Sequence, residues 1–211
     1  MKSTTLASLI IAGGVAANIL VIDNTVLDSW ITNHIYCPAR YIVEGFDMHD
    51  IINVDVAVYI DKDLNQEQKE NSKHAGLSAR AEYLHKFGIN FGMREAEEIS
   101  IPEKAYTQRF EALSGNDDMT IVFTGKKCFP SEGGGIGYSD PTMNVVFVYA
   151  EGYSAAAMRN ILIHEIGHLF YASHSNDESC FMNETSSPNK KNMQWCDETL
   201  TSIRMYKHKF W

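Results

Sequence analysis

The segment His164-Glu165-Ile166-Gly167-His168 constrains the fold of this chain more than any other part of its sequence. Residues four apart on an α-helix lie on one face, so a helix here presents the imidazoles of His164 and His168 to one metal ion. Glu165 lies about 100° around the helix axis from His164 and can reach a water molecule held by that ion. The metal acidifies the water, and the carboxylate accepts its proton. The spacing therefore predicts a metal-binding helix with its own general base.

A catalytic zinc site normally has three protein ligands and one open position. His174 is the candidate third ligand. If the helix continued, His174 would lie about 240° around the axis from His168 and about 9 Å along it, too far to share the ion. The helix must therefore end soon after His168, and the chain must turn back. No Gly, Asn or Pro occurs between the two histidines to mark that turn.

Two further residues extend the pattern: His174 lies ten residues after His164, and Met182 lies eight residues after His174. With them the chain resembles the metzincin clan of zinc endopeptidases, most closely the matrixins and reprolysins. The family pattern is HExxHxxGxxH followed by a turn that carries a Met. The resemblance implies that His164, His168 and His174 bind one catalytic zinc ion. It also implies that Glu165 is the base and that Met182 lies in the Met-turn beneath the metal.

The chain departs from the family pattern at Tyr171, which stands where the family has a Gly. In the family this Gly lets the chain reverse with a positive φ, and a non-Gly residue there costs about 1–2 kcal/mol. Zinc binding at a structural site contributes on the order of 10 kcal/mol or more. Metal ligation can offset the strain, so Tyr171 is compatible with the reversal.

The histidines outside this segment are interpreted as surface or packing residues: His34, His49, His74, His85 and His208.

Apolar patterns and turn residues predict an α/β (α+β) domain. We expect strands at residues 54–60, 89–99, 119–123 and 142–150, and helices at 66–87, 102–113, 155–170 and 197–210. Ser154 is expected to cap the helix that carries the metal-binding segment. The metzincin resemblance implies a twisted mixed sheet with an antiparallel edge strand, an active-site helix, a Met-turn and a C-terminal helix.

The resemblance identifies the strand at 142–150 as the antiparallel edge strand above the metal. An edge strand has unpaired N–H and C=O groups that can hydrogen-bond an extended peptide. An ordinary buried strand is equally compatible with these residues. The Gly-rich segment before it, 124–141, is interpreted as a loop that resembles the approach to the active site in reprolysin-like enzymes.

Composition excludes several classes of partner. The 211 residues are enough for one well-packed catalytic domain, expected at 51–211. The net charge of −9 and the pI of about 5.3 argue against nucleic-acid binding, which needs a basic surface. No phosphate-loop Lys follows the Gly-rich segment, so nucleotide binding is not expected. The expected partner is a protein or peptide substrate, and the expected state is a monomer.

The first 22 residues form an apolar segment, with Lys2 before a stretch at 6–22 that only small residues and Asn18 interrupt. They predict a signal peptide with a small-residue cleavage site at Val15-Ala16-Ala17. The stretch is also long enough for a membrane anchor, which needs about 17–25 residues. Either interpretation makes the domain secreted or otherwise extracytoplasmic, with residues 23–50 as an N-terminal extension. The remaining alternative is an ordinary buried helix.

Four cysteines, an even number in a chain expected to be exported, make disulfides plausible: Cys37, Cys128, Cys180 and Cys196. A bond between Cys180 and Cys196 would pin the Met-turn beneath the metal and leave Cys37 to pair with Cys128. Four cysteines allow three connectivities, and the sequence does not select one. In latent matrixins an N-terminal cysteine thiolate binds the zinc ion and inhibits the enzyme. Cys37 could do the same, but the residues around it lack the signature that surrounds this cysteine in the family.

The sequence thus predicts an exported zinc-dependent endopeptidase in which Glu165 is the general base. One alternative is a catalytically inactive zinc-containing binding protein of the same fold. The other is a gluzincin-type peptidase, in which a downstream Glu is the third ligand and His174 is incidental. The sequence holds no readable code for the cleavage site in the region expected to line the specificity pocket, 184–195.

Overall fold

A computed structural model of the chain describes residues 51–101, 117–126, 135–185 and 187–210. The apolar segment at 1–22, the extension at 23–50 and the helix expected at 102–113 lie outside these residues. So do Cys37, Cys128, His34 and His49. Among the described helices, none is long and apolar enough to span a membrane.

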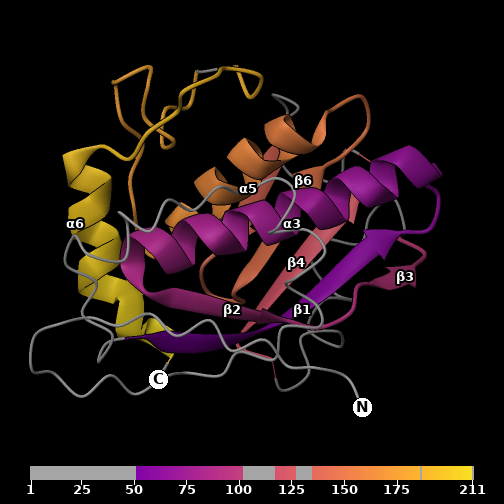
Figure 1. Ribbon diagram of the computed structural model, residues 1–211, viewed down its shortest axis with the longest axis horizontal. Coiled ribbons are helices and arrows are strands. Elements are labelled where there is room, and N and C mark those ends of the chain that lie inside the picture. Colours follow the sequence, from indigo (N-terminus) through magenta and orange to yellow (C-terminus); the bar gives the residue numbers. More distant parts are fainter. Residues whose placement is uncertain (1–50, 102–116, 127–134, 186, 211) are drawn as a thin grey trace, which may run out of the picture. The chain divides into compact units, whose positions relative to one another are not determined.

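The described residues form a mixed sheet in the order β2-β1-β4-β6-β5, with β3 also paired to β1 (Figure 1). The strands β1, β2, β3, β4 and β6 pair in parallel, and β5 pairs antiparallel with β6. Their bounds are β1 Ile52–Asp61, β2 Ile89–Met93, β3 Glu97–Ile99, β4 Met119–Thr124, β5 Gly137–Asp140 and β6 Val145–Tyr149. The α/β fold with an antiparallel edge strand is therefore confirmed.

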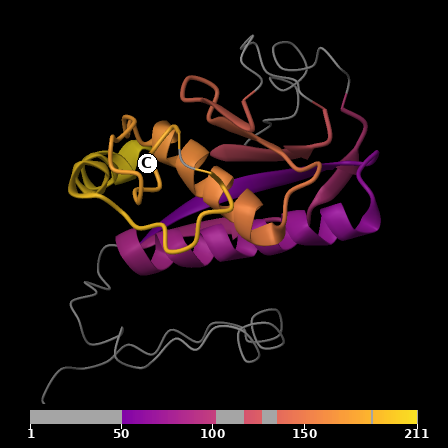
Figure 2. The same ribbon diagram turned by 90° about the horizontal axis from the view of Figure 1, so that it is seen from above.

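Two long helices, α3 (Gln66–Phe87) and α5 (Ala155–Leu169), lie side by side on one face of the sheet (Figures 1 and 2). Both begin as the sequence predicts. Asn65 and Gln68 form a capping box at the start of α3, and the Ser154 side chain accepts a hydrogen bond from Ala157 at the start of α5. The chain closes with α6 (Asp197–Tyr206) and a short 3₁₀ helix, η2 (Lys207–Phe210).

The main core lies between the sheet and the two long helices. Every residue of β4 is buried, and four of the five residues of β6 are buried, as is typical of parallel strands covered on both faces. Tyr83 of α3 is fully buried, and its hydroxyl donates to the carbonyl oxygen of Ile163 at 2.9 Å. This bond fixes α3 against α5, the helix that carries His164 and His168.

The strand predicted at 89–99 is wrong as a single element, because it is broken into β2 and β3. The ladder with β1 pairs Val56 with Met93 and resumes with Tyr59 opposite Glu97. Residues 57 and 58 of β1 therefore lie opposite three residues, 94–96. The extra residue interrupts the pairing in the manner of a β-bulge.

The edge strand is also not where the resemblance placed it. Residues 145–149 form β6, which lies between β4 and β5 and is an ordinary buried strand. The antiparallel edge is β5, inside the Gly-rich segment that the sequence predicts as a loop. The sequence Gly-Tyr-Ser-Asp has no apolar alternation, and its four residues are all half-buried, so only pairing with β6 makes them a strand.

Candidate metal centre

The helix α5 ends within one residue of the second histidine of the motif, so that the chain reverses before His174. The N–H of Tyr171 bonds the carbonyl of His168 at 2.9 Å, and the N–H of Ala172 bonds that of Gly167 at 3.1 Å. These two bonds form a Schellman motif, which requires a left-handed residue after the cap. Tyr171 supplies it with φ 59°. The reversal that the sequence requires is present, at the position where the family has Gly.

The reversal brings three imidazoles together. The Nε2 atom of His168 lies 3.1 Å from Nε2 of His164 and 3.1 Å from Nε2 of His174. A tetrahedral zinc ion with Zn–N distances of about 2.0–2.1 Å places ligand nitrogens roughly 3.3 Å apart. The three histidines therefore have a spacing that suits such an ion. Within the described part of the chain they form the one group of His, Cys, Asp or Glu with metal-site geometry.

Main-chain carbonyls orient two of these imidazoles. The Nδ1 atom of His164 lies 2.8 Å from the carbonyl oxygen of Phe181, and Nδ1 of His168 lies 2.8 Å from that of Ala172. A carbonyl oxygen only accepts hydrogen bonds, so each Nδ1 must carry the proton. The lone pair of each Nε2 is then free to bind a metal.

The third imidazole has a side-chain partner. The Nδ1 atom of His174 lies 3.4 Å from a carboxylate oxygen of Glu184, whose side chain is mostly exposed. A carboxylate behind a ligand histidine orients the ring. Glu184 was not predicted as a site residue, because nothing local marks a carboxylate ten residues downstream as a partner of His174.

Burial keeps two of the imidazoles, those of His164 and His168, neutral. Burial, and then the nearby charge of His168, lowers the pKa of His164 to about 4. Burial also lowers the pKa of His168. A histidine binds a metal only when neutral, so these shifts favour ligation at neutral pH.

Glu165 is buried beside β5, with 8% of its surface exposed. Burial raises the pKa of Glu165 to about 7, against the opposing effect of a hydrogen bond from Ser139. A Cβ atom at Gly137 would lie 2.7 Å from Cγ and 2.8 Å from Cδ of Glu165, so the carboxylate occupies the space left by a missing side chain. The segment 124–141 was expected near the active site, but the contacts of Gly137 and Ser139 with Glu165 were not predicted, because β5 itself was not.

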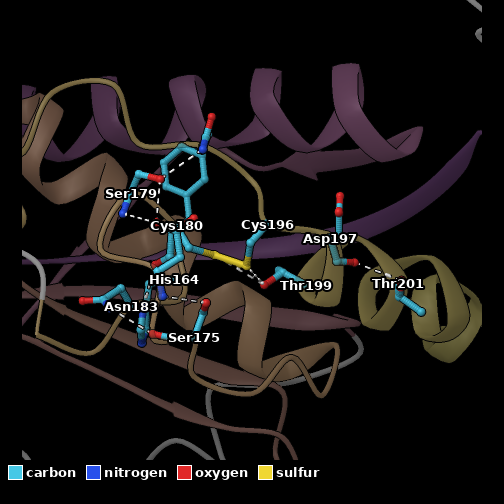
Figure 3. The surroundings of a disulfide bond; sticks show 12 residues. His164, Ser175, Ser179, Cys180, Asn183, Cys196, Asp197, Thr199 and Thr201 are labelled. Carbon is cyan, nitrogen blue, oxygen red and sulfur yellow. Dashed lines mark hydrogen bonds between the residues drawn. A yellow bond between two sulfur atoms is a disulfide. The ribbon is translucent and has the colours of Figure 1, made fainter.

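Met182 lies in the turn after His174 and is fully buried. A Cβ atom at Gly167 would lie 2.5 Å from the Met182 sulfur, so the turn packs directly on α5. Cys180, two residues earlier, forms a disulfide with Cys196 at the start of α6 (Figure 3). The Thr199 hydroxyl of α6 lies 2.9 Å from the Cys196 sulfur. This disulfide, one of the pairings that the sequence allows, joins the turn that holds Met182 to the C-terminal helix.

The three histidines and Glu165 line a cleft of about 540 Å³. One wall is β5 with the residues before it, and the other is the segment after the turn that holds Met182. Asn160 of α5 holds this second wall, because its amide nitrogen donates to the carbonyl of Pro188 at 2.9 Å and that of Lys190 at 3.3 Å. The cleft is lined by the three histidines, Glu165, Ile136, Gly137, Tyr138, Ser139, Asn160, Phe181, Asn183, Glu184, Pro188 and Met193, among others.

No family model and no curated protein matches the sequence. The structure is similar to archaemetzincin from Methanopyrus kandleri, with a TM-score of 0.55 and 14% identity over 79% of this chain and 99% of the other. It is similar to a zinc-dependent peptidase from Methanocorpusculum labreanum, with a TM-score of 0.52 and 11% identity over 70% of this chain and 99% of that one. The fold is that of zinc-dependent metallopeptidases.

Metalloproteinase-II from Bacteroides fragilis has a TM-score of 0.50 and 13% identity over 72% of this chain and 52% of its own. At such identities the likeness concerns the fold. The chemistry of this chain therefore depends on its own residues in the cleft.

Proposed function

We propose that this chain is a zinc-dependent endopeptidase of metzincin type. The observation that carries the proposal is the convergence of three imidazole Nε2 atoms in a cleft that also holds a buried carboxylate. The nearer likeness to matrixins and reprolysins is part of the proposal and is based on the spacing of the sequence motif. The fold shared with zinc-dependent metallopeptidases is consistent with it.

His164, His168 and His174 would hold one zinc ion. Zinc, when bound at such a site, acidifies a water molecule and polarises the carbonyl that is attacked. Glu165 accepts the proton of the attacking water and delivers it to the leaving amine. Burial raises the pKa of this carboxyl to about 7, so it can both take up and release a proton near neutral pH. Ser139 steadies the carboxylate by a hydrogen bond.

The substrate is proposed to be an extended peptide. Among the described strands, β5 pairs with β6 alone, and residues of β5 line the cleft. The free edge of such a strand offers main-chain donors and acceptors to a peptide backbone. That mode aligns a scissile amide without reading its side chains. Residues 142–150, where the resemblance places this edge, contain β6, which lies between β4 and β5 in the described sheet.

Export is the remaining part of the proposal. Structural disulfides persist mainly in oxidising compartments, so the bond between Cys180 and Cys196 supports an extracytoplasmic location. The signal peptide or anchor expected at 1–22 and the monomeric state remain expectations.

Two alternatives are less well supported. A gluzincin-type site needs a downstream Glu as third ligand, whereas His174 places its Nε2 atom 3.1 Å from that of His168. An inactive binding protein of the same fold would have no use for a general base, yet Glu165 is present and buried beside the histidines.

The decisive experiment compares Glu165→Gln and His174→Ala with the wild-type protein. We expect Glu165→Gln to keep stoichiometric zinc, because it is not a ligand, and to lose about 10²–10⁴-fold in peptidase activity. His174→Ala should lose zinc affinity. Zinc content is measured by mass spectrometry and activity on a peptide library, with Glu198→Gln and His85→Ala as exposed controls on α6 and α3.

The outcomes separate the three functions. Zinc-loaded wild-type protein that cleaves no peptide would favour the inactive binding protein. Unchanged zinc affinity in His174→Ala would favour the gluzincin-type site. Full activity in Glu165→Gln would remove Glu165 from the mechanism.

A further inference from the structure

The ring of Tyr171, at the reversal between His168 and His174, is contacted by the C-terminal end of the chain. Tyr171 is 51% exposed, yet its ring centroid lies 4.9 Å from that of Tyr206 in an edge-on arrangement. The ammonium of Lys209 lies 5.1 Å from the same centroid, within cation–π range. The left-handed residue is therefore held from outside by two side chains of α6 and η2.

Lys209 also binds the main chain on both sides of the site. Its ammonium donates to the carbonyl of Leu169 at 3.1 Å and to the carbonyl of Pro141 at 3.0 Å. Leu169 is the last residue of α5, where carbonyls have no partner within the helix and a positive charge is favourable. Pro141 directly follows β5. One side chain thus joins the end of the metal-binding helix to the end of the edge strand.

Phe210 anchors the same segment on the inner side of the turn. Its ring packs edge-on against Phe170 at 5.5 Å, and Phe170 is fully buried. We refer to Tyr206, Lys209 and Phe210 as the C-terminal clamp. The clamp contacts Phe170 and Tyr171, the two residues that follow α5.

These two residues decide where the third histidine lies. The Ala172 carbonyl that orients His168 is next to Tyr171, and His174 follows two residues later. A non-Gly residue disfavours the left-handed conformation that the reversal needs. Loss of the contacts to its ring would favour relaxation of Tyr171 toward ordinary φ values. The Ala172 carbonyl and His174 would then move away from the positions in which the three imidazoles converge.

We propose that the C-terminal clamp is a positioning element of the zinc site, which holds Tyr171 in the left-handed conformation so that the three imidazoles converge. The inference rests on the proposed zinc-binding function. It accounts for the absence of Gly at this position: the Tyr side chain supplies the contacts by which the conformation is held.

The test is a double-mutant cycle on the full chain, read out as the zinc dissociation constant from competition with a chelator. Lys209→Met and Tyr206→Leu are each made in the wild-type and in the Tyr171→Gly background. In the wild-type background we expect each to raise the dissociation constant about 10-fold, as for residues that orient ligand histidines. In the Tyr171→Gly background the rise should be much smaller, because Gly adopts positive φ without strain.

The controls exclude a general effect on stability. Lys126→Met removes another lysine–carbonyl bond, to Ile101 at 2.6 Å, and should leave zinc affinity unchanged. Lys209→Arg keeps charge and donors and should lose less affinity than Lys209→Met. Thermal unfolding of each zinc-free variant identifies any that fails to fold. If Lys209→Met does not fold, the double-mutant cycle is carried out with Tyr206→Leu.

Two results would overturn the inference: wild-type zinc affinity in both clamp variants, or equal losses in the two backgrounds. Equal losses would mean that the clamp supports the domain as a whole. A wild-type protein that binds no zinc would overturn the proposed function and this inference together, and the chelator assay distinguishes that result from the other two.

Discussion

At the scale of single residues, Gly137 determines where the proposed base can lie. A Cβ atom there would come within 2.7 Å of Cγ and 2.8 Å of Cδ of Glu165, so the carboxylate would have to turn away. We expect Gly137→Ala to lower kcat/KM by about 100-fold or more, the scale of a misplaced general base. Zinc content should stay at the wild-type level, because the three histidines take their orientation from other residues.

The matched control for this prediction is Gly76→Ala in α3, where the nearest atom to an added Cβ is the Met93 sulfur at 3.5 Å, an ordinary contact. Steady-state kinetics and metal analysis of both variants check it. Wild-type kcat/KM in Gly137→Ala would mean that Glu165 reaches its working position from elsewhere.

The sequence predicted which three histidines converge better than it predicted the partners of their rings. The pair His164 and His168 follows from helix geometry alone, and the need for a reversal near Tyr171 follows from His174. The acceptors that orient the rings were not predictable, because the carbonyls of Phe181 and Ala172 belong to the main chain and leave no mark in the sequence. Such contacts become visible only when the fold is known.

At the scale of elements, the segment after the turn that holds Met182 forms one wall of the cleft, and α5 holds it in place. Asn160, one turn before His164, donates to the carbonyls of Pro188 and Lys190 at 2.9 and 3.3 Å. We expect Asn160→Ala to raise KM about 10-fold through loss of roughly 1.4 kcal/mol of positioning. The value of kcat should change less than about threefold, since no reacting group is touched.

Asn189→Ala in the same wall leaves both Asn160 bonds in place and serves as the control. Steady-state kinetics on a peptide that the wild-type protein cleaves separate KM from kcat. Equal losses in kcat and in kcat/KM for Asn160→Ala would instead place Asn160 among the groups that act on the transition state.

Elements with a strong local pattern were predicted almost to the residue, and elements made by pairing were not. The helix α3 matches its predicted bounds because its caps, Asn65 and Gly88, are local signals. The strand β5 was missed because Gly137–Asp140 gains its structure only from β6. The bulge at 94–96 was missed because register between strands is a property of two segments.

At the scale of the whole molecule, the pH dependence of stability without zinc should depend on two neighbouring groups that act in opposite directions. The pKa of His164 falls from 6.5 to about 4, so between those values the unfolded chain binds a proton that the folded chain does not. Acidification then destabilises the fold. The pKa of Glu165 rises from 4.5 to about 7, so in that window the folded chain keeps the extra proton and acidification stabilises it.

The substitution Glu165→Gln removes the stabilisation by acid that comes from Glu165 and leaves the destabilisation by acid that comes from His164. As the pH falls from about 7 to about 4.5, the zinc-free wild-type protein should therefore gain stability relative to zinc-free Glu165→Gln. Urea unfolding of both proteins across this range gives the difference directly, and groups common to both cancel. Parallel curves would contradict the raised pKa of Glu165.

The architecture of the described residues could be predicted from the sequence, since the alternation of strands with helices along the chain predicts a sheet covered by helices. The comparison at 14% identity extends that result to a known fold. What the sequence could not give is the arrangement at the C-terminus, where Lys209 meets Leu169 and Pro141. Contacts between residues so distant in the chain have no local pattern.

The main-chain acceptors behind His164 and His168 have a consequence for how this centre can change. Every amino acid carries a carbonyl oxygen, so substitutions at Phe181 or Ala172 leave the acceptor itself in place. His174 differs, because its Nδ1 atom faces the carboxylate of Glu184 at 3.4 Å. Among the described residues, Glu184 is therefore the side chain whose substitution removes the side-chain partner of one of the three imidazoles. Substitutions at this position would change the properties of the His174 ring.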